Sequence, residues 1–380
     1  MCESRARKLL TIDDGNTEVN KTHSQDSHGL REIKFDDLVI DICFHPSKDV
    51  IAAGDIGGEV FIHSCSVSDT SCLMAFKHHK KACRALRFSE DGEKLFTASK
   101  DKTIKVVDLN TGSLERNMKG HESPVYSMLV TGENFLATGD DDGVLKVWDL
   151  RTESAIMTLR ENEEFISDMA IDSQRKILIC TSGDGTLTAL NIRRKKLEMQ
   201  SELFDSELLS LAVIKGAQKV VCGSGEGVLN IFNWGQWGNM SDRFPGHPMS
   251  VDCMCSLTDD IVCTGSCDGI VRAVNILPNR FIGVIGQHGD FPVENLTLSR
   301  DKNTLASCSH DQTIKLWNVA NIANEIVNPK RKAKRTNKQK LLSPTSRSNF
   351  FAGFGDETEQ STSGTADRVE SDDDESDDDE

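Results

Sequence analysis

The sequence lacks the short signatures that mark most common catalytic sites. It contains no phosphate-binding loop, no GxSxG serine motif, no HExxH zinc motif and no calcium loop. The glycine-rich stretch 223–227 lies between two apolar runs, so it is predicted to be a hairpin turn and opens no helix. The chain is therefore expected not to be an enzyme and to carry no cofactor.

Long hydrophobic runs are also missing. No stretch of about eighteen apolar residues occurs, so no membrane span is expected. The chain has 12 cysteines, most of them in apolar strand-like runs, which is typical of small core residues in a reducing compartment. The group that comes nearest to a metal pattern does not have the spacing of a usual zinc site, so no metal is expected; it comprises Cys253, Cys255, Cys263 and Cys267.

Basic residues are in deficit. The formal net charge is -16 at pH 7. An acidic body argues against a broad face for nucleic-acid phosphates, because such a face needs clustered Lys and Arg. Basic residues cluster instead at 330–340, and acidic residues are densest at 356–380. We therefore expect protein partners, with RNA contact limited to a weak one through basic segments.

What the sequence does contain is one repeated unit. In each copy a β-rich segment leads into a tight turn, and a second β-rich segment ends at a polar residue seven positions after the turn residue. The turn residues are 41 to 44 positions apart, and they are Gly57, Asp101, Asp142, Asp184, Glu226, Asp268 and Asp311. A period of about 40–45 residues is typical of a propeller blade of four antiparallel strands. Seven copies predict an all-β, seven-bladed propeller.

These copies resemble WD repeats over roughly residues 37–320. The family's structural tetrad joins a His, a Ser or Thr, the turn Asp and a Trp by hydrogen bonds. Two copies match it fully, with His121, Thr138, Asp142 and Trp148 in one and His288, Ser307, Asp311 and Trp317 in the other. The copies at Asp101 and Asp268 keep a His and a Thr but have Val in place of the Trp, and the remaining copies depart further. These departures put the tetrad in doubt there but leave the fold intact, because apolar packing can replace the network.

The resemblance also implies how the ring closes and where it ends. In such propellers the N-terminal segment often forms the outer strand of the last blade, and residues 32–35 are the candidate here. The propeller is then expected to span 31–325, after a polar, disordered segment at 1–30. A basic linker at 326–355 and an acidic tail at 356–380 follow, and both are expected to be disordered.

Three further stretches, at 78–85, 275–280 and 350–353, resemble a nucleolar branch of the family. That resemblance implies a nuclear, mainly nucleolar scaffold that supports processing of ribosomal RNA precursors and assembly of the large subunit. We also expect a monomer that works within larger complexes, with ribosome-assembly factors or pre-ribosomal particles as partners. The alternative is a substrate receptor of a cullin-type ubiquitin ligase, which would use paired Trp-Asp-x-Arg motifs. Only residues 148–151 match that motif, so this is the weaker interpretation.

The C-terminal region holds two candidate signals. The basic cluster predicts a nuclear localisation signal, although a solvated linker would have the same composition; it comprises Lys330, Arg331, Lys332, Lys334 and Arg335. Ser371 and Ser376 each precede three aspartates and are candidate phosphorylation sites.

Three groups of residues are candidates for partner binding. Trp234 and Trp237 follow a predicted strand, where they could anchor an interface or pack between blades. Arg193 and Arg194 lie at a hairpin tip, which could contact an acidic partner or RNA or simply be solvated. A Ser-rich stretch could dock onto a partner or fold back onto the propeller through Phe350, Phe351 and Phe354.

Overall fold

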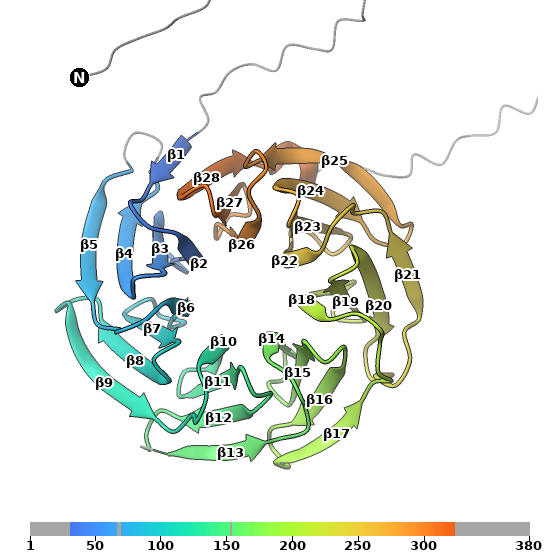
Figure 1. The fold of residues 1–380 in the computed structure, drawn as a ribbon, viewed down its shortest axis with the longest axis horizontal. Coiled ribbons are helices and arrows are strands. Elements are labelled where there is room, and N and C mark those ends of the chain that lie inside the picture. Colours follow the sequence, from blue (N-terminus) through green and yellow to red (C-terminus); the bar gives the residue numbers. More distant parts are fainter. Residues whose placement is uncertain (1–30, 67–69, 153, 324–380) are drawn as a thin grey trace, which may run out of the picture. The chain divides into compact units, whose positions relative to one another are not determined.

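The structure is a computed structural model that describes residues 31–66, 70–152 and 154–323. These residues form seven four-stranded antiparallel sheets arranged around a central axis (Figure 1). The prediction of a seven-bladed β-propeller is therefore confirmed. The segments predicted to be disordered, 1–30 and 326–380, lie outside the described residues.

Each blade runs from an innermost strand at the axis to an outermost strand at the rim. Blades one to six take four consecutive strands each, from β2–β5 to β22–β25, and blade seven takes β26, β27, β28 and β1. The innermost strands are β2 (Val39–Phe44), β6 (Cys83–Phe88), β10 (Val125–Gly132), β14 (Ile166–Ile171), β18 (Leu208–Ile214), β22 (Val251–Ser256) and β26 (Val293–Leu298). The second strands are β3 (Val50–Asp55), β7 (Lys94–Ser99), β11 (Phe135–Asp140), β15 (Ile177–Ser182), β19 (Lys219–Ser224), β23 (Ile261–Ser266) and β27 (Thr304–Ser309).

The two outer layers of the blades complete the list. The third strands are β4 (Glu59–Ser64), β8 (Thr103–Asp108), β12 (Leu145–Asp149), β16 (Leu187–Asn191), β20 (Val228–Asn233), β24 (Ile270–Asn275) and β28 (Thr313–Asn318). The outermost strands are β5 (Cys72–Lys77), β9 (Ser113–Lys119), β13 (Ala155–Leu159), β17 (Lys196–Gln200), β21 (Asp242–Pro245), β25 (Arg280–Gln287) and β1 (Arg31–Lys34). A short helix, α1 (Ala320–Ala323), follows the last strand.

The ring closes through the N-terminal strand, as the segment at 32–35 predicted. β1 pairs antiparallel with β28, with Ile33 opposite Ile314. Ile33 is buried and belongs to an apolar cluster that also contains Val39 of blade one and Cys308 of blade seven. The two ends of the repeat region are therefore joined in one sheet, which removes the exposed strand edges that an open ring would leave.

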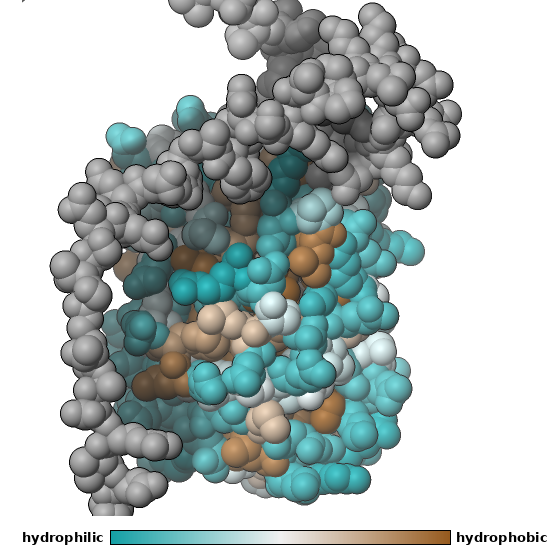
Figure 2. Space-filling view, turned by 90° about the vertical axis from the view of Figure 1, so that its right-hand side faces the viewer, coloured by the Kyte–Doolittle hydropathy of each residue, from teal (hydrophilic) through white to brown (hydrophobic). Residues whose placement is uncertain are grey.

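Stacking of the blades explains the apolar runs in the sequence. The second strand β19 is almost wholly buried, because each sheet packs between two neighbours. The approach is close enough to require small residues: a Cβ on Gly139 would lie 2.3 Å from the Ile166 Cβ of the next blade. The outermost strands are more exposed. Figure 2 shows the rim over β21 and β25, where scattered hydrophobic patches lie among hydrophilic side chains.

The two faces of the ring carry different connections. We call the face on which the innermost strands begin the entry face; it holds the turns between second and third strands, such as 141–144. We call the opposite face the exit face; it holds the turns between first and second strands, such as 133–134 and 172–176, and between third and fourth strands, such as 192–195. Because binding residues concentrate on loops held by a rigid frame, the loops on these two faces are candidate binding surfaces.

Candidate functional site

The first group of polar residues lies inside the blades. In blade seven, His288 Nδ1 is 2.7 Å from Asp311 Oδ2, and His288 Nε2 is 2.7 Å from Ser307 Oγ. Trp317 Nε1 donates to the same Ser307 oxygen at 2.8 Å. The four side chains form the continuous network that the tetrad pattern predicts. All of the imidazole nitrogens are used, so this network is structural and has no free base to offer.

In blade three the predicted network is wrong in one member. His121 Nδ1 is 2.7 Å from Asp140 Oδ2, whereas Asp142 accepts a hydrogen bond from Ser123 and is exposed. The rest follows the pattern, with Thr138 Oγ1 2.7 Å from His121 Nε2. The reason is that Asp140 ends β11 and is buried, so its carboxylate occupies the space that the turn residue fills in blade seven.

The degenerate blades show other solutions. His79 of blade two contacts both Thr97 and Asp101, at 2.8 and 3.1 Å. In blade six the expected contact of Asp268 with His247 is absent among the described atoms, because Arg272 donates to both carboxylate oxygens of Asp268, at 3.0 and 2.6 Å. Burial lowers the pKa of His247 to about 4, so this imidazole is neutral at physiological pH.

Blade four has an amide where the other networks have a histidine. Asn162 Nδ2 donates to Thr186 Oγ1 at 2.9 Å and to Thr188 Oγ1 at 3.1 Å. The sequence interpretation missed Asn162, because it searched for histidine at that position. An amide can satisfy the same neighbouring hydroxyls, since it carries both a donor and an acceptor.

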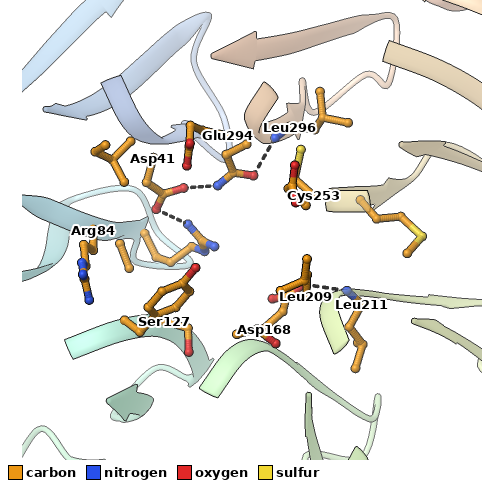
Figure 3. A pocket seen from close by; sticks show the side chains of 17 residues that line it. Asp41, Arg84, Ser127, Asp168, Leu209, Leu211, Cys253, Glu294 and Leu296 are labelled. Carbon is orange, nitrogen blue, oxygen red and sulfur yellow. Dashed lines mark hydrogen bonds and ion pairs between the residues drawn. The ribbon is translucent and has the colours of Figure 1, made fainter. Parts of the chain in front are cut away.

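The central channel is a polar cavity. It has a volume of about 430 Å³ and takes lining residues from the innermost strand of every blade (Figure 3). Asp41 accepts hydrogen bonds from Arg87 Nη1 at 2.8 Å, from the Leu86 amide at 2.6 Å and from the Asn295 amide group. These partners come from blades two and seven, so Asp41 of blade one ties three blades together.

Two further carboxylates in the channel have a raised pKa. Burial raises the pKa of Asp168 to about 6, even though it accepts hydrogen bonds from the Met169 and Leu211 amides at 2.7 and 2.9 Å. Burial also raises the pKa of Asp252 to about 6. A carboxylate with such a pKa could act as a general base if a free nucleophile lay beside it.

The possible nucleophiles in the channel are already engaged. Ser127 Oγ donates to the Ile166 carbonyl at 2.6 Å, and Ser167 Oγ donates to the Leu208 carbonyl at 2.6 Å. Cys253 makes the same kind of contact to the next blade, and burial raises its pKa well above the usual value, so the thiol stays protonated. Within the described lining, these side chains join neighbouring innermost strands and none is paired with a base.

The entry face carries a group of exposed apolar residues that the sequence interpretation missed. They lie on entry-face loops or at strand starts, with exposed fractions of 36% to 73%, and are Ile56, Tyr126, Leu203, Met249 and Phe291. Their signal in the sequence was their position, since each precedes or begins an innermost strand or follows a second strand. Large apolar side chains gathered on rigid loops are typical of a protein-binding surface.

Tyr126 is the best supported of these residues. Its ring lies 4.8 Å from that of Phe165, and the Arg84 guanidinium carbon is 5.3 Å from its centroid. Arg84 in turn pairs with Asp141 at 2.5 Å. Burial of its phenol raises the pKa of Tyr126 to about 12, so the hydroxyl stays protonated. The ring is therefore held rigid while part of it faces solvent, as an interface anchor requires.

Comparison with known proteins supplies the family. A family model described as WDR55 matches residues 30–322. The chain belongs to the WDR55 family. WD repeat-containing protein 55 of Bos taurus is 43% identical over 98% of this chain and 99% of its own length. The Homo sapiens protein of that name is 43% identical over 95% of each chain, and the Danio rerio protein is 44% identical over 87% of each.

Membership of the WDR55 family and the WD-repeat propeller support a protein-interaction scaffold. The names of the relatives above describe no enzymatic activity. Among the described residues, no cluster of His, Cys, Asp or Glu side chains could hold a metal ion. In the same residues, no helix has the length and apolar character needed to cross a membrane.

The two tryptophans proposed as anchors take different places in this WDR55-family propeller. Trp237 is 5% exposed and packs in the apolar cluster of blades four and five with Phe232, which is the second of the two alternatives, packing between blades. Trp234 is half-buried against it, with ring centroids 4.8 Å apart at 80°. The loop folds back onto the blade because two indoles bury more area by packing on each other than by facing water.

The basic hairpin tip is exposed, between β16 and β17 on the exit face. Arg193 Nη2 donates to the Gln174 carbonyl at 2.8 Å, and the Arg194 amide donates to Asn191 Oδ1 at 2.9 Å. Contact of this tip with an acidic partner or RNA stays a prediction. The predicted localisation signal at 330–335, the phenylalanines at 350–354 and the two serines of the tail lie outside the described residues, and they stay predictions too.

The single Trp-Asp-x-Arg motif, on which the ligase alternative depends, lies at the end of β12. Arg151 donates to both carboxylate oxygens of Asp149, at 2.9 and 2.7 Å, and its guanidinium lies over the Phe135 ring at 5.7 Å. The guanidinium is thus held in place by its own turn. This local pairing accounts for the motif without an adaptor.

Proposed function

We propose that this WDR55-family chain is a non-enzymatic scaffold of nucleolar ribosome assembly, supporting processing of ribosomal RNA precursors and assembly of the large subunit. The observation that carries the scaffold role is the group of exposed apolar side chains on the entry-face loops. The nucleolar part rests on the resemblance of three stretches to a nucleolar branch of the WD-repeat family and on the basic run at 330–340.

The entry face suits a protein partner in a pre-ribosomal particle. Met249 and Phe291 expose 52% and 51% of their surface, and each stands on the loop that leads into an innermost strand. A partner that buries both side chains gains hydrophobic free energy without having to order the loops first, because the closed propeller already holds them. Charged groups at the mouth, such as Glu294, would add selectivity.

Co-sedimentation with large-subunit precursors tests the surface. We expect the double variant Met249→Asp/Phe291→Asp to lose most co-sedimentation, because two charges would be placed in a desolvated interface. The matched control is Val284→Asp, which changes a side chain that is 63% exposed on the rim strand β25. Normal co-sedimentation of the double variant, with both variants folded by circular dichroism, would sink the entry-face assignment.

A fluorescent fusion tests the cellular part of the proposal. We expect nucleolar signal from the intact chain and loss of that signal when residues 330–340 are deleted. Depletion should also cause unprocessed precursor RNA to accumulate. An intact fusion that remains in the cytoplasm would overturn the nucleolar role, while leaving the binding surface to be judged by co-sedimentation with whatever partner is then found.

A further inference from the structure

A groove lies on the exit face where blades three and four meet. Its walls come from the β10–β11 turn, the start of β13, the β14–β15 turn and the β16–β17 turn. Its volume is about 490 Å³, which is large enough for two or three amino-acid side chains. Because all four segments lie on the exit face, the groove is separate from the exposed apolar residues of the entry face.

The floor of the groove is apolar. It is formed by half-buried side chains of one aromatic and three branched aliphatic residues, Phe135, Ile156, Ile171 and Ile192. Thr131 lies beside them and is 4% exposed, yet its hydroxyl has no hydrogen-bond partner among the described residues. A buried hydroxyl without a partner is unfavourable, so this group is available to a ligand that brings a donor or acceptor into the groove.

The rim of the groove is basic. Arg175 Nη2 donates to Glu90 at 2.6 Å, which leaves the rest of its guanidinium facing the groove. Arg193 donates one hydrogen bond to the Gln174 carbonyl and forms no ion pair with a described carboxylate. Lys195 is exposed and likewise forms no ion pair with a described carboxylate. The lining therefore offers unpaired positive charge above an apolar floor.

One acid also belongs to the lining. Glu133 is exposed at the β10–β11 turn, so the groove holds three cations and one anion. This local excess of positive charge stands on a chain whose formal net charge is -16. The net negative charge of the chain would repel an acidic ligand, whereas the cations of the groove would attract it. Such a ligand would therefore be directed to the groove.

We propose that the groove binds a short segment of another protein in which one or two bulky apolar side chains are flanked by Asp or Glu. The apolar side chains fill the space over Ile171 and Ile192, and the acids meet Arg193 and Lys195. The Thr131 hydroxyl pairs with the backbone of the bound segment. This second surface goes beyond the entry-face scaffold role, and the two surfaces could hold two partners on opposite faces of one ring.

RNA fits the groove less well. Sequence-tolerant binding of single strands uses aromatic platforms for the bases. Within the described lining the aromatic residue is Phe135, and the Arg151 guanidinium already lies over its ring. The three isoleucines offer no stacking surface for a base, and Glu133 would face phosphates. A peptide with an apolar centre uses the floor, whereas a nucleic acid would use only the rim.

Two substitutions separate binding from folding. Lys195 has a φ of 52°, in the left-handed region where glycine is favoured, so Lys195→Gly removes the charge and relieves the backbone. Thr131→Val removes the unpaired hydroxyl at nearly constant volume. Both variants should fold at least as well as the parent chain. The control is Lys302→Gly, a lysine with a φ of 57° in the turn between the first and second strands of blade seven, which also lies on the exit face.

The experiment is selection from a phage library of random twelve-residue peptides against the full chain, followed by fluorescence anisotropy with the most enriched peptide. We expect enrichment of peptides with apolar residues flanked by acids. Lys195→Gly should weaken their binding by roughly fivefold, and Thr131→Val by a similar factor, while Lys302→Gly leaves it unchanged. Binding should also weaken as salt is raised.

Three outcomes would overturn the proposal. One is selection of peptides without the acid-flanked pattern, and another is equal binding to the parent chain and to Lys195→Gly. The third is an occupant of another kind: oligo(U) RNA that binds and is lost in Lys195→Gly, a dimer that is lost in that variant, or peptide binding that appears only after residues 341–380 are removed. All of these are measured in solution, so failure of the nucleolar role in cells would not affect them.

Discussion

Blades three and seven each join a histidine, a hydroxyl residue, an aspartate and a tryptophan in one network, but their carboxylates come from different positions. In blade seven the acid is Asp311 in the turn after β27, whereas in blade three it is Asp140, the last residue of β11. Each places its Oδ2 atom 2.7 Å from the histidine Nδ1. The network therefore requires a carboxylate at one place in space, and two neighbouring positions of the chain can supply it.

The residue at the end of the second strand decides which position is used. In blade seven this residue is Ser309, whose hydroxyl accepts a hydrogen bond from the Asp311 amide at 3.4 Å and leaves the inner space to the aspartate. In blade three it is Asp140, whose Oδ1 accepts from the Val144 amide at 2.9 Å while Oδ2 reaches the histidine. Asp142 is then left to face solvent.

The largest expected effect comes from removing the carboxylate that serves the network of blade three. Asp140→Ala should lower the free energy of unfolding by about 3 kcal/mol, because it leaves His121 and two turn amides without their acceptor. Asp142→Ala is the matched control and should cost less than about 1 kcal/mol, because that carboxylate is exposed. Urea unfolding followed by circular dichroism measures both. Equal costs, or a larger cost at Asp142, would contradict the assignment of Asp140.

Substitution of the network tryptophan should also destabilise blade three more than blade seven. Trp148 is 1% exposed and Trp317 is only half-buried, although each donates to a hydroxyl at 2.8 Å. Trp148→Phe should cost about 2 kcal/mol and Trp317→Phe about 1 kcal/mol, because the cavity left by the smaller ring can collapse or fill with water more easily near the surface. The same unfolding measurement applies. A larger loss for Trp317→Phe would show that blade closure, and not burial, sets the cost.

The sequence was sufficient for the architecture for a simple physical reason. A period of 41 to 44 residues with turn chemistry at each repeat can be buried on both faces only by stacking around an axis, and the segment at 32–35 supplied the closing strand. The network of blade seven could also be predicted, because the second strand ends in Ser309 and the turn then contains a single aspartate, Asp311. In blade three, by contrast, Asp140, Asp141 and Asp142 are chemically identical in sequence, and only their rotamers and burial distinguish them.

The binding surfaces were harder to predict for the same kind of reason. Trp237 follows a strand, and nothing local in the sequence shows that its loop folds back onto Phe204 and Phe232. The groove needs three turns and the start of β13, which together run from Thr131 to Lys195 along the chain, so it exists only after two blades have packed. Arg193 was found as part of a basic run, but the apolar floor beneath it was not.

The smallest expected effect concerns blade six, in which an arginine replaces the lysine found in blade seven. Arg272 donates to both oxygens of Asp268, whereas Lys315 at the equivalent position in blade seven lies 3.3 Å from Asp311 Oδ2 and shares that atom with His288 Nδ1. The planar fork of arginine binds a carboxylate through two parallel bonds, and lysine cannot. Arg272→Lys should therefore release Asp268 to accept from the unpaired Nδ1 of His247.

The readout is the titration of His247. Its pKa is lowered to about 4 by burial and by Arg272, so the unfolded chain binds more protons between about pH 4 and 6.5, and stability falls as the pH drops through that window. Arg272→Lys should raise this pKa and reduce the loss of stability between pH 7 and pH 5 by about 1 kcal/mol. Lys315→Arg is the reciprocal variant and should lower the pKa of His288 further. If neither histidine shifts in a nuclear magnetic resonance titration, the geometry of the fork is not what separates the two blades.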